Sequence, residues 1–445
     1  MSATRNDQLE DFAGAIIAPD SPEYPKAART ALASAEPALI LRPIDVADVQ
    51  RAVRFAAASD LPLVVRGGGH SAAGLSTIDD GIVIDLGVLD SIELLGDRRV
   101  RVGGGALWRH VVEALAPHGL VISSGDTADV GVGGLTLSGG IGWLVRRHGL
   151  TLDHLRAVEL VTADGTVIRV DDREHEDLFW ALRGGGGAYG IATAFEFEAQ
   201  PAAQFTFASL TFPAGQAEHI VPAWVRFMRT APRAISSTLV LSNPFTGGVD
   251  APIEITFARC DAESVDDALA ALRIAGTPLK EAVSRVPYAE ILHEGNELPA
   301  GLRVALRNGF ISPASADAAA PAIARIAASE QPASIVVHSL GGAFGQTAPE
   351  ATAFAHRGAE LMVSTFAAAP VAAYEGLRDR MDEIWRTLEP FTDGAYANSL
   401  DGTVADAVAS VYPESTRRRL ADIKRTYDPT NLFSRTFAPA PEHAR

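Results

Sequence analysis

Glycine clusters in the first half of the sequence carry its clearest chemical signal. Four of them, each containing three or more glycines, occupy 66–71, 102–106, 130–143 and 183–190. Glycine lets the backbone approach a ligand closely, and consecutive free N–H groups in such loops bind phosphate oxygens. Together the four clusters predict a cradle for the pyrophosphate of a dinucleotide.

The clusters do not by themselves identify the dinucleotide. The stretch 131–142 is glycine-rich, but it does not follow a strand and open a helix as the fingerprint of a βαβ unit would. The pattern therefore gives little support to a Rossmann-type module that binds NAD. That alternative stays open, and it predicts a colourless protein.

The other reactive residue types indicate no second site of a familiar kind. His110, His118 and His175 lack metal-ligand spacing, so no metal site is expected. Cys260 is the only cysteine, which excludes an intrachain disulfide and a cysteine-based zinc or iron–sulfur site. Ser71 does not lie in the G-x-S-x-G pattern of a nucleophilic serine.

The composition is that of an acidic globular protein. Of 445 residues, 47 % are hydrophobic, and the charges sum to 38 − 55 = −17. Such an acidic chain repels a phosphate backbone, so no nucleic-acid partner is expected. No apolar run approaches the roughly 20 residues that cross a bilayer, and the first 14 residues do not form a secretory signal. We expect a cytoplasmic protein with no membrane partner and leave its oligomeric state open.

Hydrophobic periodicity and turn residues divide the chain into two regions with different patterns of predicted strands and helices. In the first region, strands are predicted at 38–43, 61–70, 81–86, 91–95 and 98–103, helices at 46–59, 106–117 and 174–183, and a hairpin at 155–170. After Pro201, strands are predicted at 238–242, 253–259 and 334–340, and helices at 214–230, 262–275, 315–329, 371–389 and 414–426. This order predicts an α+β protein with a second α+β domain.

A series of motifs resembles one family along residues 35–435. They are RGGGHS (66–71), VGVGGLTLSGGIGWLVRRHGLTLDHL (130–155), DLFWALRGGGGAYGIAT (177–193), FAHRG (354–358), YANSLD (396–401) and YDPTNLF (427–433). Their order is similar to that of the berberine-bridge-enzyme-like FAD-linked oxidases of the vanillyl-alcohol-oxidase superfamily. The sequence most resembles the bacterial type, which includes 6-hydroxy-D-nicotine oxidase.

The resemblance implies a fold and an activity. It implies a PCMH-type FAD-binding domain at 1–204 (core about 35–203), a substrate domain with an antiparallel sheet at 205–395, and a segment at 396–445 that returns to the FAD domain. The implied enzyme takes hydride from a CH–N or CH–OH group of a small organic substrate to flavin N5, and O2 reoxidises the flavin to give H2O2. A dehydrogenase or oxidative cyclase of secondary metabolism on the same fold is the alternative, and a flavin-holding protein without catalysis is another.

The resemblance also implies which residues hold the cofactor. His70 corresponds to the histidine that bonds the flavin 8α-methyl covalently. Thr127 stands where many members carry a second, cysteinyl link, so a single covalent bond is expected. The implied cofactor-binding residues are Arg66, Gly67, Gly68, Gly69, His70, Ser71, Thr127, Val130, Gly131, Gly133, Gly134, Gly139, Gly140, Gly142, Trp143, His148, Gly190, Ile191, Tyr396 and Asn398.

The positions that hold a base in family members carry no base here. A count from the His356-Arg357 pair puts Thr365 at one such position, and Ser399 and Ala72 replace two tyrosines of the oligosaccharide oxidases. An amine can release hydride without a base because its lone pair stabilises the iminium, so the absence favours CH–N oxidation. The catalytic group is left unassigned, with four candidates for a replacement base: His338, Glu360, Tyr288 and Asp401.

Overall fold

The computed structural model describes residues 9–202, 204–241, 252–261, 263–295, 298–299, 301–327, 333–404 and 406–441. The N-terminal residues on which the absence of a secretory signal was judged lie partly outside these ranges. So do the ends of the segments predicted at 238–242, 262–275 and 315–329.

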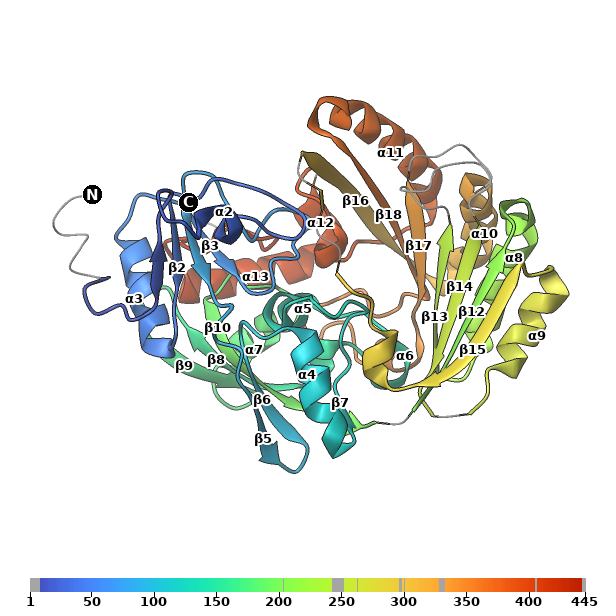
Figure 1. Ribbon diagram of the computed structural model, residues 1–445, viewed down its shortest axis with the longest axis horizontal. Helices are drawn as coiled ribbons and strands as arrows, with labels where there is room; N and C mark the ends of the chain where they lie inside the picture. Colours follow the sequence, from blue (N-terminus) through green and yellow to red (C-terminus); the bar gives the residue numbers. More distant parts are fainter. Residues whose placement is uncertain are drawn as a thin grey trace.

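Two larger sheets and a short two-stranded one, made of β7 (Leu120–Val121) and β11 (Gln200–Pro201), form the first part of the molecule (Figure 1). The first has the order β1 (Ala15–Ile17), β2 (Leu39–Arg42), β4 (Ile82–Asp85) and β3 (Leu63–Arg66), and β4 runs parallel to both β2 and β3. The second is antiparallel, with the order β5 (Ile92–Gly96), β6 (Arg99–Gly103), β10 (Ile191–Glu198), β8 (Leu155–Val161) and β9 (Val167–Asp171).

Short helices connect these strands. The amphipathic helix α3 (Val46–Ala57) joins β2 to β3 and begins at Asp45, whose carboxylate accepts a hydrogen bond from the backbone N–H of Asp48 (2.8 Å). The others include α4 (Trp108–Leu115), α5 (Val132–Ser138), α6 (Val145–His148) and α7 (Glu176–Leu182). Strand β3 runs directly into the first glycine cluster, and α5 lies within the third. Regular secondary structure therefore positions both clusters.

One seven-stranded antiparallel sheet forms the second part. Its order is β15 (Lys280–Val286), β12 (Phe205–Phe212), β14 (Ile253–Arg259), β13 (Ile235–Leu241), β17 (Ser334–Ser339), β18 (Leu361–Pro370) and β16 (Leu302–Ile311). Helices α8 (Ala217–Thr230), α9 (Asp266–Ala275), α10 (Pro313–Ala327) and α11 (Tyr374–Leu388) lie on the face that points away from the first part (Figure 1).

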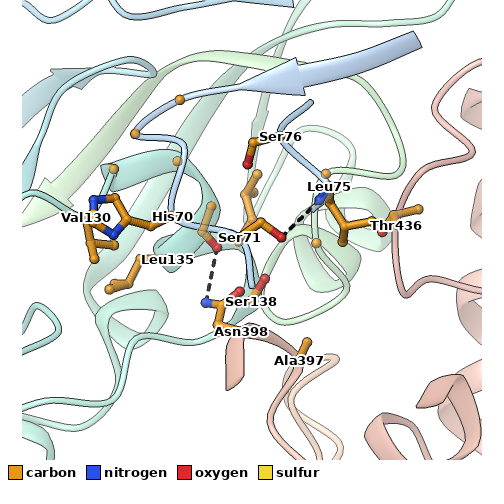
Figure 2. A pocket seen from close by; sticks show the side chains of 18 of the residues that line it. His70, Ser71, Leu75, Ser76, Val130, Leu135, Ser138, Ala397, Asn398 and Thr436 are labelled. Carbon is orange, nitrogen blue, oxygen red and sulfur yellow. Dashed lines mark hydrogen bonds between the residues drawn. The ribbon is translucent and has the colours of Figure 1, made fainter. Parts of the chain in front are cut away.

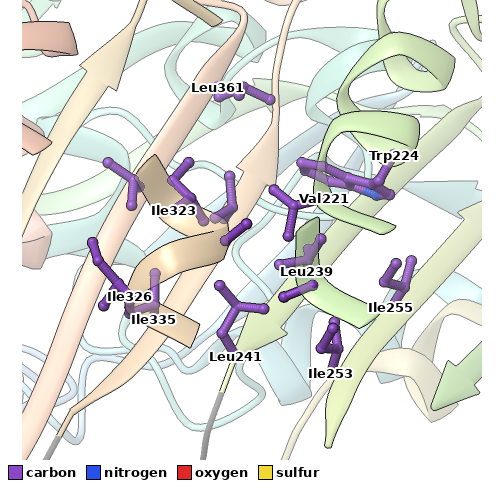
Figure 3. Close-up of a cluster of buried hydrophobic side chains, with 14 of the residues drawn as sticks. Val221, Trp224, Leu239, Leu241, Ile253, Ile255, Ile323, Ile326, Ile335 and Leu361 are labelled. Carbon is purple, nitrogen blue, oxygen red and sulfur yellow. The ribbon is translucent and has the colours of Figure 1, made fainter. Parts of the chain in front are cut away.

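Alternation along the strands gives the large sheet two different faces. Apolar side chains such as Leu239, Ile255 and Leu361 point toward the helices and pack with Val221 and Trp224 of α8 in the main core (Figure 3). The opposite face is more polar and faces the first part of the molecule. It includes Thr238, Thr256, His338 and Ser364.

The chain returns to the first part after the large sheet. Helices α12 (Ala407–Val411) and α13 (Glu414–Tyr427) lead to a final extended segment. Lys424 of α13 is buried, and its ammonium group donates hydrogen bonds to the backbone oxygens of Ala188 (2.6 Å) and Phe433 (3.0 Å) and to the Asp428 carboxylate (2.5 Å). A buried charge is tolerated when it is paired and hydrogen-bonded in this way, so this contact anchors the C-terminal segment.

The predicted fold class is confirmed: the chain is α+β, and the sheet of its second part is antiparallel. Each predicted strand and helix overlaps an element of the same kind. Strands β1, β7, β10, β11, β12, β15, β16 and β18 lie outside the predicted strand ranges. Strand β15 is largely exposed at the sheet edge, and β16 contains Gly309 and two arginines, so neither shows the apolar alternation that marks a strand. In the part of the chain that the structure describes, no helix is long and apolar enough to cross a membrane.

Removing the Trp224 side chain tests the main core. Trp224 is fully buried, and its indole N–H donates to the Ser237 hydroxyl (2.8 Å). We expect Trp224→Ala to lower the free energy of unfolding by about 3–5 kcal/mol, since it leaves a cavity and removes the hydrogen bond that the Ser237 hydroxyl accepts. Urea unfolding followed by circular dichroism measures this. The matched control is Ile274→Ala, because Ile274 is 88 % exposed and should change little; equal effects would contradict the core assignment.

Candidate functional site

A cavity of about 450 Å³ lies where the glycine loops, the C-terminal segment and the polar face of the large sheet meet. This volume falls within the range typical of small-molecule and cofactor sites. The first part supplies the loop after β3 and the start of α5, the large sheet supplies His338 and Met362, and the C-terminal segment supplies 396–399. Figure 2 shows His70 at one side of this cavity and Thr436 at the other.

Two glycine loops cross at the cavity wall with their backbones in direct contact. A Cβ atom on Gly68 would lie 2.3 Å from the amide nitrogen of Gly131, and one on Gly131 would lie 2.3 Å from the nitrogen of Gly68. No side chain fits at either position, so only glycine permits this approach.

The loop that contains Gly68 offers hydrogen-bond donors to a ligand. Among the described residues, none accepts a hydrogen bond from the backbone N–H groups of 67–71. Gly134, at the start of α5, has no atom within 4 Å of an added Cβ, so its backbone faces open space. Unpaired amides along a cavity wall are the donor set that a pyrophosphate requires, so these residues fit a dinucleotide.

His70 follows this loop and is half-buried (Figure 2). Burial lowers the pKa of its imidazole, and the nearby Asp129 carboxylate opposes this effect only in part. Asp129 is itself held by the Arg109 guanidinium (2.5 Å) and by the N–H of Gly295 (3.0 Å). The His70 imidazole is therefore held mainly neutral at neutral pH.

Tyr396 joins three parts of the molecule around the cavity. Its hydroxyl accepts hydrogen bonds from the N–H of Gly140 and the amide of Asn398 (both 3.0 Å). Its backbone N–H and carbonyl pair with the side chain of Asn308 on β16 (2.7 and 2.8 Å). The Asn398 amide also reaches the carbonyl of Gly134, 3.5 Å away, which is the bond drawn from Asn398 in Figure 2.

His338 and Asp126 occupy the cavity wall at the large sheet. Both line the main cavity and a second, very small cavity beside Trp143. His338 lies on β17 between Thr238 of β13 and Met362 of β18. Burial lowers the pKa of His338, although the Asp126 carboxylate acts to raise it. Sequence analysis did not find Asp126; its position next to Thr127 was the only available signal.

The structure brings most of the predicted cofactor-binding residues to this cavity, and the rest lie behind its wall. The lining set is Gly67, Gly68, Gly69, His70, Ser71, Thr127, Val130, Gly131, Gly133, Gly134, Gly190, Ile191, Tyr396 and Asn398. The residues outside the lining are Arg66, Gly139, Gly140, Gly142, Trp143 and His148.

The residues behind the wall have structural contacts of their own. Arg66 is buried and bonds the Asp85 carboxylate (2.9 Å). Gly140 donates its N–H to Tyr396, as described above. Trp143 packs edge-on against Phe207, and burial lowers the pKa of His148 to about 4.

Of the four candidate bases, His338 alone lines the cavity. The Tyr288 hydroxyl shares a hydrogen bond with that of Ser124 (2.7 Å), and burial raises the pKa of Tyr288 to about 12. Glu360 accepts two hydrogen bonds from the Arg229 guanidinium. Asp401 accepts hydrogen bonds from the N–H of Leu306 and from the N–H and hydroxyl of Thr403. These three side chains are held by partners away from the cavity.

The assignment of Thr365 to a base position is wrong. The indole N–H of Trp385 on α11 donates to the Thr365 hydroxyl (2.7 Å), so this side chain points into the helix layer. Neighbouring residues on a strand point to opposite faces, which places Met362 and Ser364 on the cavity side. Met362 lines the cavity, and the buried hydroxyl of Ser364 has no partner among the described residues.

Removing the Tyr396 hydroxyl tests its joining role. In Tyr396→Phe the buried N–H of Gly140 loses its acceptor, so we expect the free energy of unfolding to fall by about 1–3 kcal/mol. Chemical unfolding of the purified variant measures this. The comparison variant is Tyr24→Phe, whose lost hydroxyl donates to the carbonyl of Pro37 at a partly exposed site. If Tyr396→Phe lowers the free energy of unfolding no more than Tyr24→Phe does, Tyr396 does not hold the parts of the molecule together through its hydroxyl.

The sequence matches two family models. Residues 37–171 match the FAD binding domain, and residues 395–436 match the family described as berberine and berberine like. These matches include the glycine loops that cross at the cavity and the Tyr396 segment that closes it.

Curated relatives extend this similarity over nearly the whole chain. An uncharacterised FAD-linked oxidoreductase of Bacillus subtilis is 30 % identical over 94 % of this chain and 95 % of its own length. The (R)-6-hydroxynicotine oxidase of Paenarthrobacter nicotinovorans is 31 % identical over 91 % of this chain and 92 % of its own.

A solved structure agrees with these relatives. The crystal structure of 6-hydroxy-D-nicotine oxidase from Arthrobacter nicotinovorans superposes with a TM-score of 0.82 at 28 % identity, covering 97 % of this chain and 99 % of that one. The glycine-lined cavity, the returning C-terminal segment and the full-length similarity support one conclusion: this chain belongs to the berberine-bridge-enzyme-like family of FAD-linked oxidoreductases.

Proposed function

We propose that this protein is an FAD-dependent oxidase that takes hydride from a CH–N or CH–OH group of a small organic substrate. The observation that carries the proposal is the continuity of the cavity from the glycine loops to His338 on the large sheet. One end suits a dinucleotide, and the other places a neutral imidazole and a carboxylate beside the space where a substrate would meet the flavin.

The proposed division of the chain follows the sheets. Residues 1–204 and 396–445 form the cofactor-binding unit, and residues 205–395 form the substrate unit. The contacts of Tyr396 with Gly140 and of Lys424 with Ala188 support the return of the last segment to the first unit.

We propose a single covalent bond to the flavin, from the His70 imidazole to the 8α position. A nucleophilic imidazole must be neutral, and burial provides this by lowering the pKa of His70. Thr127, which also lines the cavity, has a hydroxyl where a second tether would need a thiol. Cys260 is not among the cavity-lining residues; it packs partly buried against a separate apolar cluster around Phe205 and Tyr288.

The remaining chemistry divides between the cofactor and the protein. FAD held by the glycine loops would supply the acceptor for the hydride of the substrate carbon, and O2 would take up the electrons to give H2O2. His338 accepts the proton that the substrate nitrogen or oxygen must lose, because burial keeps this imidazole neutral. The polar face of β13 and β17 orients the substrate.

Substitution of His70 tests the covalent bond. We expect flavin to remain with the wild-type polypeptide after denaturation in acid or detergent, and to be released from His70→Ala. The measurement is flavin fluorescence of the denatured band in a gel. The control is His293→Ala, a nearby histidine that donates only its backbone N–H here. Flavin released from the wild type would remove the His70 assignment, and a protein that takes up no FAD would overturn the proposed function.

The pH profile tests His338. Because burial lowers its pKa below the usual 6.5, the neutral base persists to lower pH, and the acidic limb of kcat/KM should lie below pH 6.5. Asp126 and His293 are the titratable groups that act on it. We expect His338→Gln to lower kcat/KM by about 10²–10⁴-fold and to remove this limb.

The measurement is peroxide release with the best substrate from a screen of amines and alcohols, between pH 5 and 9. His219→Gln serves as control, because His219 is exposed on α8. An unchanged limb in His338→Gln would refute the role. Reduction of the flavin by substrate without O2 consumption would identify a dehydrogenase instead.

A further inference from the structure

Asp126 is a half-buried carboxylate in the cavity wall whose charge no described group compensates. In the described part of the chain, its carboxylate accepts one hydrogen bond, from the neighbouring Thr127 hydroxyl (3.1 Å). Among the residues that the structure describes, no arginine, lysine or histidine forms an ion pair with it. The carboxylate therefore faces the cavity with most of its acceptor capacity unused.

Three buried carboxylates among the described residues, those of Asp85, Asp428 and Asp401, have partners within the protein. Asp85 is bound by Arg66 and Arg42, and Asp428 by Lys424. Asp401 forms no ion pair with a described residue but accepts three hydrogen bonds from backbone and hydroxyl donors. Asp126 is only half-buried but lacks such partners, so a positively charged group in the cavity would complement its charge.

The surroundings of Asp126 restrict what that occupant is. The same wall carries His338, Met362 and Ile141, and the adjoining small cavity carries Thr238 and Trp143. None of these side chains supplies a permanent positive charge. Among the described residues, Arg435 supplies the one guanidinium that lines the cavity, and its neighbour Thr436 lies across the cavity from His70 in Figure 2.

We propose that Asp126 binds a positively charged nitrogen of the substrate, so that the enzyme oxidises an amine and not an alcohol. This inference rests on the proposed function and narrows its substrate class. The carboxylate is the counter-ion of the ammonium group, and His338 lies beside it to receive a proton.

The steps balance with groups already named. The ammonium nitrogen gives one proton to the neutral imidazole of His338 and keeps the electron pair. The adjacent C–H bond then breaks, and its two electrons leave with the hydrogen to the oxidised FAD, while the nitrogen lone pair forms a C=N bond. The product is an iminium cation, which water hydrolyses after release.

Charge explains the preference for an amine. Positive charge remains on the substrate nitrogen at the start and end of the sequence, next to the Asp126 carboxylate, which stabilises it. An alcohol would develop negative charge on oxygen as its proton leaves, and the same carboxylate would repel that charge. Asp126 is therefore the residue that separates the two substrate classes.

Three probes of equal shape and different charge test the inference without turnover. Benzamidinium, benzamide and benzoate are titrated into the flavin-loaded protein, and binding is followed by the visible absorption of the flavin and by calorimetry. We expect benzamidinium to bind at least about tenfold more tightly than benzamide, because hydrogen bonds to a buried charge are strong, and benzoate to bind most weakly.

In Asp126→Asn the difference between benzamidinium and benzamide should fall to within about twofold. Asp126→Ser is the second variant, in case the amide disturbs the Thr127 contact. The matched control is Asp164→Asn, since Asp164 also accepts from a neighbouring threonine hydroxyl but lies in an exposed turn; it should keep the full preference. Flavin content and circular dichroism establish that each variant is folded.

A wild-type protein that binds benzamide as tightly as benzamidinium, or that binds no benzamidinium, overturns the inference. So does a preference that survives in a folded Asp126 variant. These failures leave the proposed function intact as long as the protein holds flavin and reduces O2. A protein without flavin, in contrast, refutes the proposed function itself.

Discussion

The contact between Gly68 and Gly131 is the constraint on which the rest of the site depends. Two loops from distant parts of the sequence meet there backbone to backbone, at a separation that excludes even a methyl group. Their approach turns a row of peptide N–H groups toward one cavity. Without it the loop after β3 and the start of α5 would be two separate turns, and neither would present enough donors to hold a pyrophosphate.

The large sheet contributes to the site through its less hydrophobic face. The apolar side chains of one face pack in the core beneath helices α8 to α11, and the polar residues lie on the other face. That face is brought over the glycine loops by Asn308, whose side chain pairs with both backbone groups of Tyr396. The distribution of roles follows: the first part supplies fixed backbone dipoles, and the large sheet supplies side chains that can vary without disturbing the cradle.

Much of this architecture was accessible from the sequence, for identifiable reasons. The glycine clusters, the strand at 61–70 and the hairpin at 155–170 are local signals, which can be recognised from a single sequence. Ordered motifs then led to the family, the cofactor and His70. The structure confirmed the fold class and brought most of the predicted cofactor-binding residues to one cavity.

The parts that sequence reasoning missed depend on tertiary contacts. A count from the His356-Arg357 pair pointed to Thr365 on β18. Packing decides which alternate side chains of a strand face the core, and Trp385 holds Thr365 in the helix layer. Glu360 and Tyr288 have suitable chemistry, yet Arg229 and Ser124 hold them elsewhere. Asp126 carries no motif, and its importance comes from a cavity that only the folded chain creates.

The place of Tyr396 along the chain has a consequence for biosynthesis. Its hydroxyl accepts a hydrogen bond from Gly140 beside the cavity, and its backbone holds the large sheet at Asn308, but it lies after all of the described strands in the sequence. During translation, the glycine loops and the strands emerge from the ribosome long before the segment that encloses the cavity. The dinucleotide can therefore be enclosed only late in synthesis or after release, so the nascent protein passes through a stage in which the cradle is open to solvent.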